Sequence, residues 1–294
     1  MQDADPARST GAAKLAGELP VRVASALVLA PLAIGIAYIG GWIFAAFWGG
    51  AAILMLREWV MLATGDDRRV VLLVGGISVV LATGFSAADG SSFAGAQGPL
   101  MFAAIAAIAA GSMGAMVLTR RQHSIWAAAG IPYAGAVAVA PTVLRSDIQY
   151  GFQAIILIFA IVWTTDILAF FIGRTVGGPK LAPRISPKKT WSGAIGGTGA
   201  AVAAAVGIAC AIGLTGLVPI AILAAVLSVI GQAGDLFESA LKRRFRAKDS
   251  GQLIPGHGGL MDRLDAFVAA AGLAAIIGVG RGGLEAPARG LLLW

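Results

Sequence analysis

Apolar residues fill most of the chain in long blocks, and short polar segments separate these blocks. Many of the blocks reach the roughly 20 residues that an α-helix needs to cross the hydrocarbon core of a bilayer. The pattern therefore predicts an all-α, polytopic transmembrane protein with about nine spans. The predicted spans cover residues 22–40, 42–63, 70–88, 98–119, 124–143, 153–173, 191–213, 216–238 and 258–280.

Basic residues alternate between the two sides of this nine-span arrangement. If the N-terminus is cytoplasmic, the inner segments hold nearly all of the positive charge, at Arg8, Lys14, Arg22, Arg68, Arg69, Arg120, Arg121, Arg174, Lys180, Arg184, Lys188, Lys189, Lys242, Arg243, Arg244, Arg246 and Lys248. The outer loops hold only Arg145, and the C-terminal tail adds Arg281 and Arg289. Because cytoplasmic loops are enriched in Lys and Arg, we expect a cytoplasmic N-terminus and an external C-terminus.

Composition agrees with a membrane protein and narrows the function classes. Hydrophobic residues make up 58% of the 294 residues, charged residues 13%, and mean hydropathy is +0.84. Topology accounts for much of the net charge of +7, so no nucleic-acid partner is expected. The single cysteine, Cys210, excludes an intramolecular disulfide and a multi-cysteine metal site.

The spans and their loops divide the chain into four regions. Residues 1–21 form a cytoplasmic tail, and residues 22–150 form an N-terminal transmembrane scaffold. Residues 151–280 form the catalytic transmembrane region, which contains two cytoplasmic motif loops, and residues 281–294 form a C-terminal tail.

The first motif loop follows the sixth span. Asp166 lies within an apolar run, where a carboxylate is costly unless it meets a partner or a polar cavity. A structural hydrogen bond or salt bridge would also explain it. The segment that follows mixes hydroxyl and ammonium groups, which suit phosphate oxygens. The candidate cofactor-binding residues of this loop are Asp166, Ser186, Lys188, Lys189 and Thr190.

The second motif loop follows the eighth span. If that span continues as a helix, Asp235, Ser239, Lys242 and Arg246 fall at i, i+4, i+7 and i+11 and share one face. A stripe of carboxylate, hydroxyl and cations that begins inside the membrane is not typical of a solvated surface.

Glycine and proline then end this helix, and two carboxylates follow at the start of the ninth span. Asp262 and Asp265 lie three positions apart, at i and i+3, and share a face. Carboxylates beside cations indicate phosphate chemistry with a divalent metal, because Mg²⁺ typically takes one or two carboxylates and leaves positions for substrate phosphates. A basic loop alone could instead bind anionic lipid headgroups, but this reading leaves the carboxylates unexplained.

The segment from Ser239 to Asp265 resembles the signature of the phosphatidate cytidylyltransferase (CDP-diacylglycerol synthase) family. It contains Ser-x-Leu-Lys-Arg, Lys248-Asp249, Gly251, Ile254-Pro255 and His-Gly-Gly-Leu-x-Asp-Arg-Leu-Asp ending at Asp265. The loop from Asp166 to Gly193 is similar to the second polar block of the family. One departure is Ser192, where many members have glutamate.

This resemblance implies transfer of the cytidylyl group of CTP to phosphatidate, giving CDP-diacylglycerol and pyrophosphate. It also implies a homodimer and a metal centre in which Asp235 and Asp262 hold Mg²⁺, paired with a monovalent cation such as K⁺. Both motif loops fall on the inner side of the predicted topology, so we expect the active site to face the cytoplasm from a bacterial inner membrane. The candidate catalytic residues are Ser239, Lys242, Arg243, Lys248, Asp249, His257, Arg263 and Asp265.

Two alternatives to the cytidylyltransferase remain open. A CTP-dependent lipid or polyprenol kinase would use similar groups but would transfer the γ-phosphate. An anion transporter would use Asp166 and Asp235 as intramembrane coupling sites, although it gives no role to the block from Ser239 to Asp265.

Overall fold

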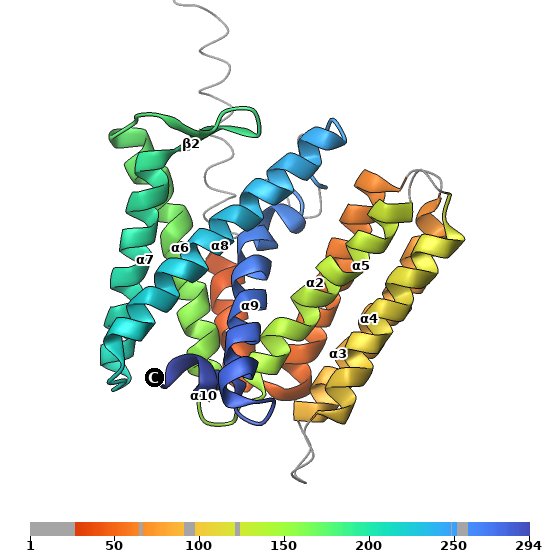
Figure 1. Ribbon diagram of the computed structural model, residues 1–294, viewed down its shortest axis with the longest axis horizontal. Helices are drawn as coiled ribbons and strands as arrows, with labels where there is room; N and C mark the ends of the chain where they lie inside the picture. The colour runs from red at the N-terminus through yellow and green to blue at the C-terminus, as the bar shows by residue number, and fades with distance from the viewer. Residues whose placement is uncertain (1–26, 65–66, 91–97, 121–123, 248, 252–257) are drawn as a thin grey trace, which may run out of the picture.

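The computed structural model describes residues 27–64, 67–90, 98–120, 124–247, 249–251 and 258–294. Nearly all of these residues are helical, as Figure 1 shows. The first helical segment is Leu27–Ile39. The others are α2 (Gly41–Ala63), α3 (Arg68–Gly90), α4 (Pro99–Leu118), α5 (Ser124–Arg145), α6 (Gly151–Thr175), α7 (Trp191–Ala211), α8 (Leu217–Arg244), α9 (Met261–Gly282) and α10 (Pro287–Leu292).

The prediction of a polytopic helical membrane protein is confirmed. Within the described residues, eight helices, α2 to α9, are long and apolar enough to cross a membrane, and Leu27–Ile39 is a shorter apolar helix. Each of the nine predicted spans therefore corresponds to an apolar helix. Their outer surfaces carry large exposed apolar side chains, such as Leu73, Phe102, Ile195 and Ile276, which suit contact with lipid.

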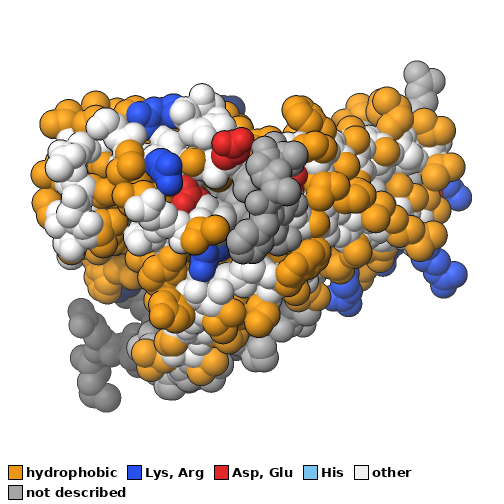
Figure 2. Space-filling view, turned by 90° about the horizontal axis from the view of Figure 1, so that it is seen from below, with side chains coloured by type: hydrophobic (Ala, Val, Ile, Leu, Met, Phe, Trp, Pro, Cys, Tyr) orange, Lys and Arg blue, Asp and Glu red, His pale blue; other side chains and the backbone are white. Residues whose placement is uncertain are grey.

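Charged groups are sparse on the end of the molecule that lies opposite the β1–β2 hairpin. Seen from that end, hydrophobic side chains cover most of the visible surface (Figure 2). Arg145, at the end of α5, binds there to the first helical segment, Leu27–Ile39, because its Nε donates to Ala37 O at 2.5 Å. The short helix α10 lies at the same end and packs against α9. The segment 281–294, expected as a tail, thus includes an ordered helix.

Aromatic side chains join the two halves of the chain in the core. Trp48 of α2 stacks on Phe267 of α9 with ring centroids 4.6 Å apart, and Phe159 of α6 lies 5.3 Å from the same ring. All three side chains are at most 4% exposed. The N-terminal helices therefore pack directly against the helix that carries Asp262.

A small antiparallel hairpin connects α6 to α7 and was not expected from the sequence. Its strands are β1 (Lys180–Ala182) and β2 (Ser186–Thr190), and Lys180 pairs with Thr190. The chain leaves α6 through Gly177 and Gly178, whose φ angles of 68° and 101° favour glycine. The hydroxyl and ammonium groups of Ser186–Thr190 therefore lie on a strand.

Helices α6 and α7 approach each other closely because α7 presents glycine. A Cβ atom on Gly197 would lie 2.7 Å from Thr165 O and 2.9 Å from Ala169 Cβ. A Cβ atom on Gly199, two residues further along α7, would meet no atom within 4 Å.

This difference gives a matched test of the packing of α6 against α7. We expect Gly197→Ala to lower stability by about 1–3 kcal/mol, because the added methyl group forces the helices apart. Gly199→Ala should leave stability unchanged or slightly raise it. Thermal unfolding of both variants in detergent measures the effect, and equal melting temperatures would contradict the close contact.

Candidate active site

The two motif loops meet at the hairpin end of the molecule. β2 and the end of α8 both lie at the top of Figure 1, as does the start of α9. An ion pair joins Lys189 of β2 to Asp235 of α8. In addition, Arg243 Nε donates to Ile185 O at 3.4 Å. The two polar blocks that the sequence separates therefore form one site.

Helix α8 carries the predicted polar stripe as far as Arg244. Asp235 and Ser239 are one turn apart, and Ser239 Oγ donates to Asp235 Oδ1 at 3.4 Å. Lys242 follows on the same face. The prediction for Arg246 was wrong, because α8 ends at Arg244 and Arg246 has a φ of 55° in the turn beyond it. Arg246 therefore does not continue the stripe.

The carboxylate of Asp262 is held by the loop that precedes α9. Its Oδ2 accepts hydrogen bonds from Ser250 N at 3.1 Å, Ser250 Oγ at 2.8 Å and Gly259 N at 3.0 Å. Its Oδ1 forms an ion pair with Lys242 of α8. One oxygen of the Asp262 carboxylate is therefore held by the loop before α9, and the other is directed toward Lys242 of α8.

Lys242 lies between the carboxylates of Glu238 and Asp262, and sequence reasoning missed Glu238. Its Nζ lies 2.6 Å from Glu238 Oε2 and also contacts Asp262. Glu238 is 1% exposed, and its Oε1 has no hydrogen-bond partner within the described part of the chain. The spacing of four residues between Glu238 and Lys242 is the signal that could have predicted this pair.

Three further carboxylates of the site come from three helices. Asp235 interacts electrostatically with Asp166 of α6 and with Asp265 of α9. The backbones of α8 and α9 approach closely there, since a Cβ atom on Gly234 would lie 2.6 Å from Asp265 O. Asp265 is 8% exposed, and its Oδ1 accepts from Ala266 N at 2.8 Å. Lys189 and Arg263 are cations beside this acidic group.

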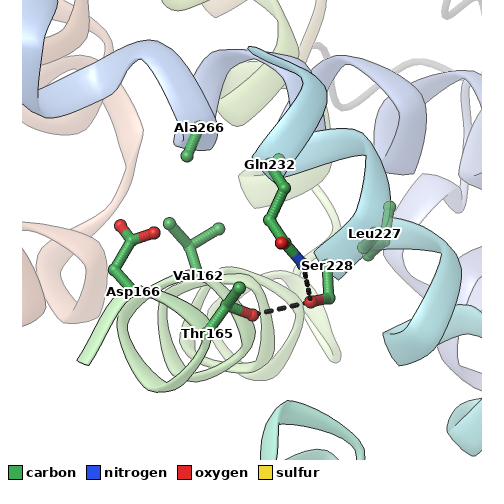
Figure 3. Close-up of a pocket in the computed structure, with 8 residues that line it drawn as sticks. Val162, Thr165, Asp166, Leu227, Ser228, Gln232 and Ala266 are labelled. Carbon is green, nitrogen blue, oxygen red and sulfur yellow. Dashed lines mark hydrogen bonds between the residues drawn. The ribbon is translucent and has the colours of Figure 1, made fainter. Parts of the chain in front are cut away.

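A pocket opens beside this acidic group, between α6, α8 and α9. In Figure 3, Asp166 and Gln232 extend toward the space between the helices. The hydroxyl groups of Thr165 and Ser228 form a hydrogen bond with their oxygens 2.8 Å apart, and Gln232 Nε2 donates to Thr198 Oγ1 at 3.0 Å. The residues that line the pocket are Val162, Thr165, Asp166, Leu227, Ser228, Gly231, Gln232 and Ala266.

The remaining predicted residues divide into three groups. Thr190 is buried and caps α7, because its Oγ1 accepts from Gly193 N at 3.2 Å. Five residues lie on the surface of the site end or are half-buried there: Ser186, Lys188, Arg243, Asp249 and Arg263. The last two, Lys248 and His257, lie outside the described residues.

Glu58 of α2 is a second site residue that sequence reasoning missed. It is 3% exposed, and its carboxylate accepts hydrogen bonds from Leu260 N at 2.8 Å and Met261 N at 2.7 Å. In the sequence, Glu58 follows Arg57 near one end of the predicted span 42–63. The available signal was a carboxylate within an apolar run.

The donor set can be compared with what a metal ion requires. Within the ranges that the structure describes, no three His, Cys, Asp or Glu side chains are grouped around one position that could hold an ion. Asp235 of α8 and Asp262 of α9 nevertheless have the hard oxygen atoms that Mg²⁺ prefers, and Mg²⁺ needs only one or two carboxylates when substrate phosphates complete its shell. The donor types at the site are therefore those that a Mg²⁺ ion arriving with a phosphorylated substrate would use.

Comparison with known proteins agrees with this geometry. The model of the family described as "Cytidylyltransferase family" matches residues 20–279. A protein of Brucella abortus biovar 1 (strain 9-941), named phosphatidate cytidylyltransferase, is 40% identical over 260 residues, which cover 88% of this chain and 93% of that protein.

Two more distant relatives carry the same name and match a shorter part of the chain. The protein of Bacillus subtilis (strain 168) is 42% identical over 130 residues, covering 42% of this chain and 47% of that protein. The protein of Rickettsia typhi (strain ATCC VR-144 / Wilmington) is 43% identical over 128 residues, covering 39% and 53%. The resemblance found in the motifs is confirmed, and the chain belongs to the cytidylyltransferase family.

Proposed function

We propose that the protein transfers the cytidylyl group of CTP to phosphatidate, giving CDP-diacylglycerol and pyrophosphate. The observation that carries the proposal is the meeting of both motif loops at one end of the helical bundle, where Lys189 pairs with Asp235 and Lys242 with Asp262. A site of this kind can receive a water-soluble nucleotide and a lipid phosphate together. The names of the relatives at 40–43% identity support the same reaction.

In this reaction a phosphate oxygen of phosphatidate attacks the α-phosphorus of CTP. The new bond joins that oxygen to the α-phosphorus, and the bond between the α-phosphorus and the bridging oxygen to the β-phosphate breaks. A phosphate monoester is already ionised near neutral pH, so the nucleophile needs no strong general base. The main tasks of the protein are to position two polyanions and to offset their charge.

The lysines of the site are suited to that second task. Lys189 and Lys242 each contact a carboxylate, and each can move its ammonium group onto a phosphate oxygen without leaving the site. Glu238 keeps Lys242 in place when Asp262 Oδ1 takes another partner. Asp235 and Asp262 would hold Mg²⁺, which supplies Lewis-acid polarisation of a phosphoryl oxygen when bound.

We further propose that the site faces the cytoplasm from a bacterial inner membrane and that the protein is a homodimer. The excess of Lys and Arg in the loops at the hairpin end supports the orientation, since the opposite end holds Arg145, Arg281 and Arg289. The bacterial relatives support the membrane. The homodimer rests on the family resemblance.

The reaction can be tested with the purified protein, phosphatidate, Mg²⁺ and CTP labelled at the α-phosphate. Label should enter the lipid, and unlabelled pyrophosphate should be released. A CTP-dependent kinase would leave the α-label in a soluble nucleotide, whereas a transporter would show anion flux in liposomes without CTP turnover. EDTA should stop the reaction, and activity at full rate in EDTA would contradict the metal assignment.

Replacing Asp262 tests the centre of the site. We expect Asp262→Asn to lower kcat by at least about 100- to 1,000-fold, because Lys242 loses one of its two carboxylate partners and a metal loses a charged ligand. The variant should still elute as a folded protein in detergent. Glu285→Gln, which changes an exposed carboxylate at the opposite end, is the control and should keep full activity.

Labelling of single cysteines tests the orientation. In a Cys210→Ala background, Lys180→Cys places a thiol at the exposed first position of β1, and Glu285→Cys places one at the opposite end. A membrane-impermeant maleimide should label the first variant only in inverted membrane vesicles and the second only in intact cells permeabilised at the outer membrane. The reverse pattern would invert the proposed topology.

A further inference from the structure

The buried carboxylate of Glu58, in α2, has hydrogen-bond partners that all belong to the second motif loop and the start of α9. Leu260 N donates to Oε1, while Met261 N donates to Oε2 at 2.7 Å. Ser250 Oγ lies 3.1 Å from Oε2 and 2.8 Å from Asp262 Oδ2, so its one hydroxyl proton can be donated to either carboxylate. Among the described residues no lysine or arginine forms an ion pair with Glu58, so its partners there are neutral donors. One side chain thus binds two separate segments of the second motif loop.

Two of these donors are the first backbone amides of α9. The first amides of a helix have no partner inside the helix, and a negative charge at that end is favourable. The N-cap residue, Leu260, makes no side-chain capping bond of its own. Glu58 therefore caps α9 from another helix, immediately before Asp262.

The loop closes around Glu58 without spare room. A Cβ atom on Gly251 would lie 2.7 Å from Glu58 Oε1, and one on Gly259 would lie 2.7 Å from Glu58 Oε2 and also overlap Ser250 Oγ. A side chain at either position would therefore push the loop away from α2. The two glycines allow the backbone to reach the carboxylate directly.

The segments held by Glu58 are the segments that hold Asp262. Ser250 donates to Asp262 through both its backbone N and its Oγ, and Gly259 N adds a third bond to the same oxygen. Ser250 Oγ lies within hydrogen-bond distance of both carboxylates. A displacement of Glu58 would therefore change the direction of Asp262 without touching it.

We propose that Glu58 is a positioning residue for the active site. Through Ser250 and the first amides of α9, it fixes the loop that orients the Asp262 carboxylate toward Lys242. This inference rests on the proposed function for its kinetic consequence. Its structural part, the anchoring of the loop to α2, stands on the hydrogen bonds alone.

The test compares Glu58→Gln with Asp147→Asn in the purified full-length protein. Asp147 is the matched control because it is also buried, at 5% exposure, and also binds backbone amides near a helix start, from Gln149 N, Tyr150 N and Arg289 N. These contacts lie at α6 and α10, at the end opposite the hairpin. Both changes should lower the melting temperature, but only the first should disturb Asp262.

We expect Glu58→Gln to lower kcat by about 10- to 100-fold, the usual effect of losing a group that orients a ligand. The KM for phosphatidate should change much less than kcat, and the Mg²⁺ concentration for half-maximal activity should rise. Amide hydrogen exchange over residues 258–264 should become faster. Asp147→Asn should keep the wild-type kcat, Mg²⁺ response and exchange in this segment.

Two results would overturn the inference: a kcat of Glu58→Gln within twofold of wild type, or a loss of kcat in both variants that follows their loss of stability. If Glu58→Gln does not fold, Gly259→Ala and Gly272→Ala replace the pair. Of these two positions, residue 259 is the one at which an added Cβ would meet Glu58, and at residue 272 it would meet nothing within 4 Å. Equal kcat in these two variants would also reject the proposal.

Failure of the proposed function gives a different result. If the wild-type protein forms no labelled lipid, the assignment of the reaction fails, while hydrogen exchange over residues 258–264 still tests the anchoring. Faster exchange in Glu58→Gln than in Asp147→Asn would support the anchor, and equal exchange in the two variants would reject it.

Discussion

A carboxylate that lies on an apolar helix of a membrane protein needs hydrogen-bond donors or a cation beside it, because burying it without such partners costs free energy. Much of the geometry of the site follows from this requirement. Glu58 accepts hydrogen bonds from amides and a hydroxyl of the loop before α9. Asp262 accepts hydrogen bonds from amides and forms an ion pair with a lysine, and Asp235 forms an ion pair with Lys189. Each of these contacts crosses from one helix or loop to another, so satisfying the carboxylates also brings α2, α8, α9 and the hairpin together.

The two halves of the chain have unequal but connected tasks. The C-terminal helices supply the groups that the proposed chemistry needs, on α8, on β2 and at the start of α9. The N-terminal helices supply no candidate for contact with substrate, yet α2 reaches the site through Glu58 and reaches α9 again through the stacking of Trp48 on Phe267. The scaffold predicted from hydropathy therefore contributes to the geometry of the site as well as to its support.

The sequence predicted the spans well because the length of an apolar run limits where a membrane helix can begin and end. The run at 70–88, for example, became α3 at Arg68–Gly90. The stripe of Asp235, Ser239 and Lys242 was also predictable, since helical spacing decides which residues share a face. The contacts of Glu58 were not, because they join residues about 200 positions apart. The hairpin was missed because its strands are short and contain Pro187 and three lysines, and Arg246 was misplaced because the helix ends two residues earlier.

The separation between Glu58 and its partners also bears on how the protein is made. Met261 lies 203 residues after Glu58, so their hydrogen bond cannot form until α9 has been synthesised and packed against α2. The intervening helices can insert one after another, but during that time Glu58 lacks the donors that the loop before α9 supplies. A growing chain therefore holds its lysines and aspartates without the arrangement that aligns them. Completion of the last long helix is the step in biogenesis at which the site is assembled.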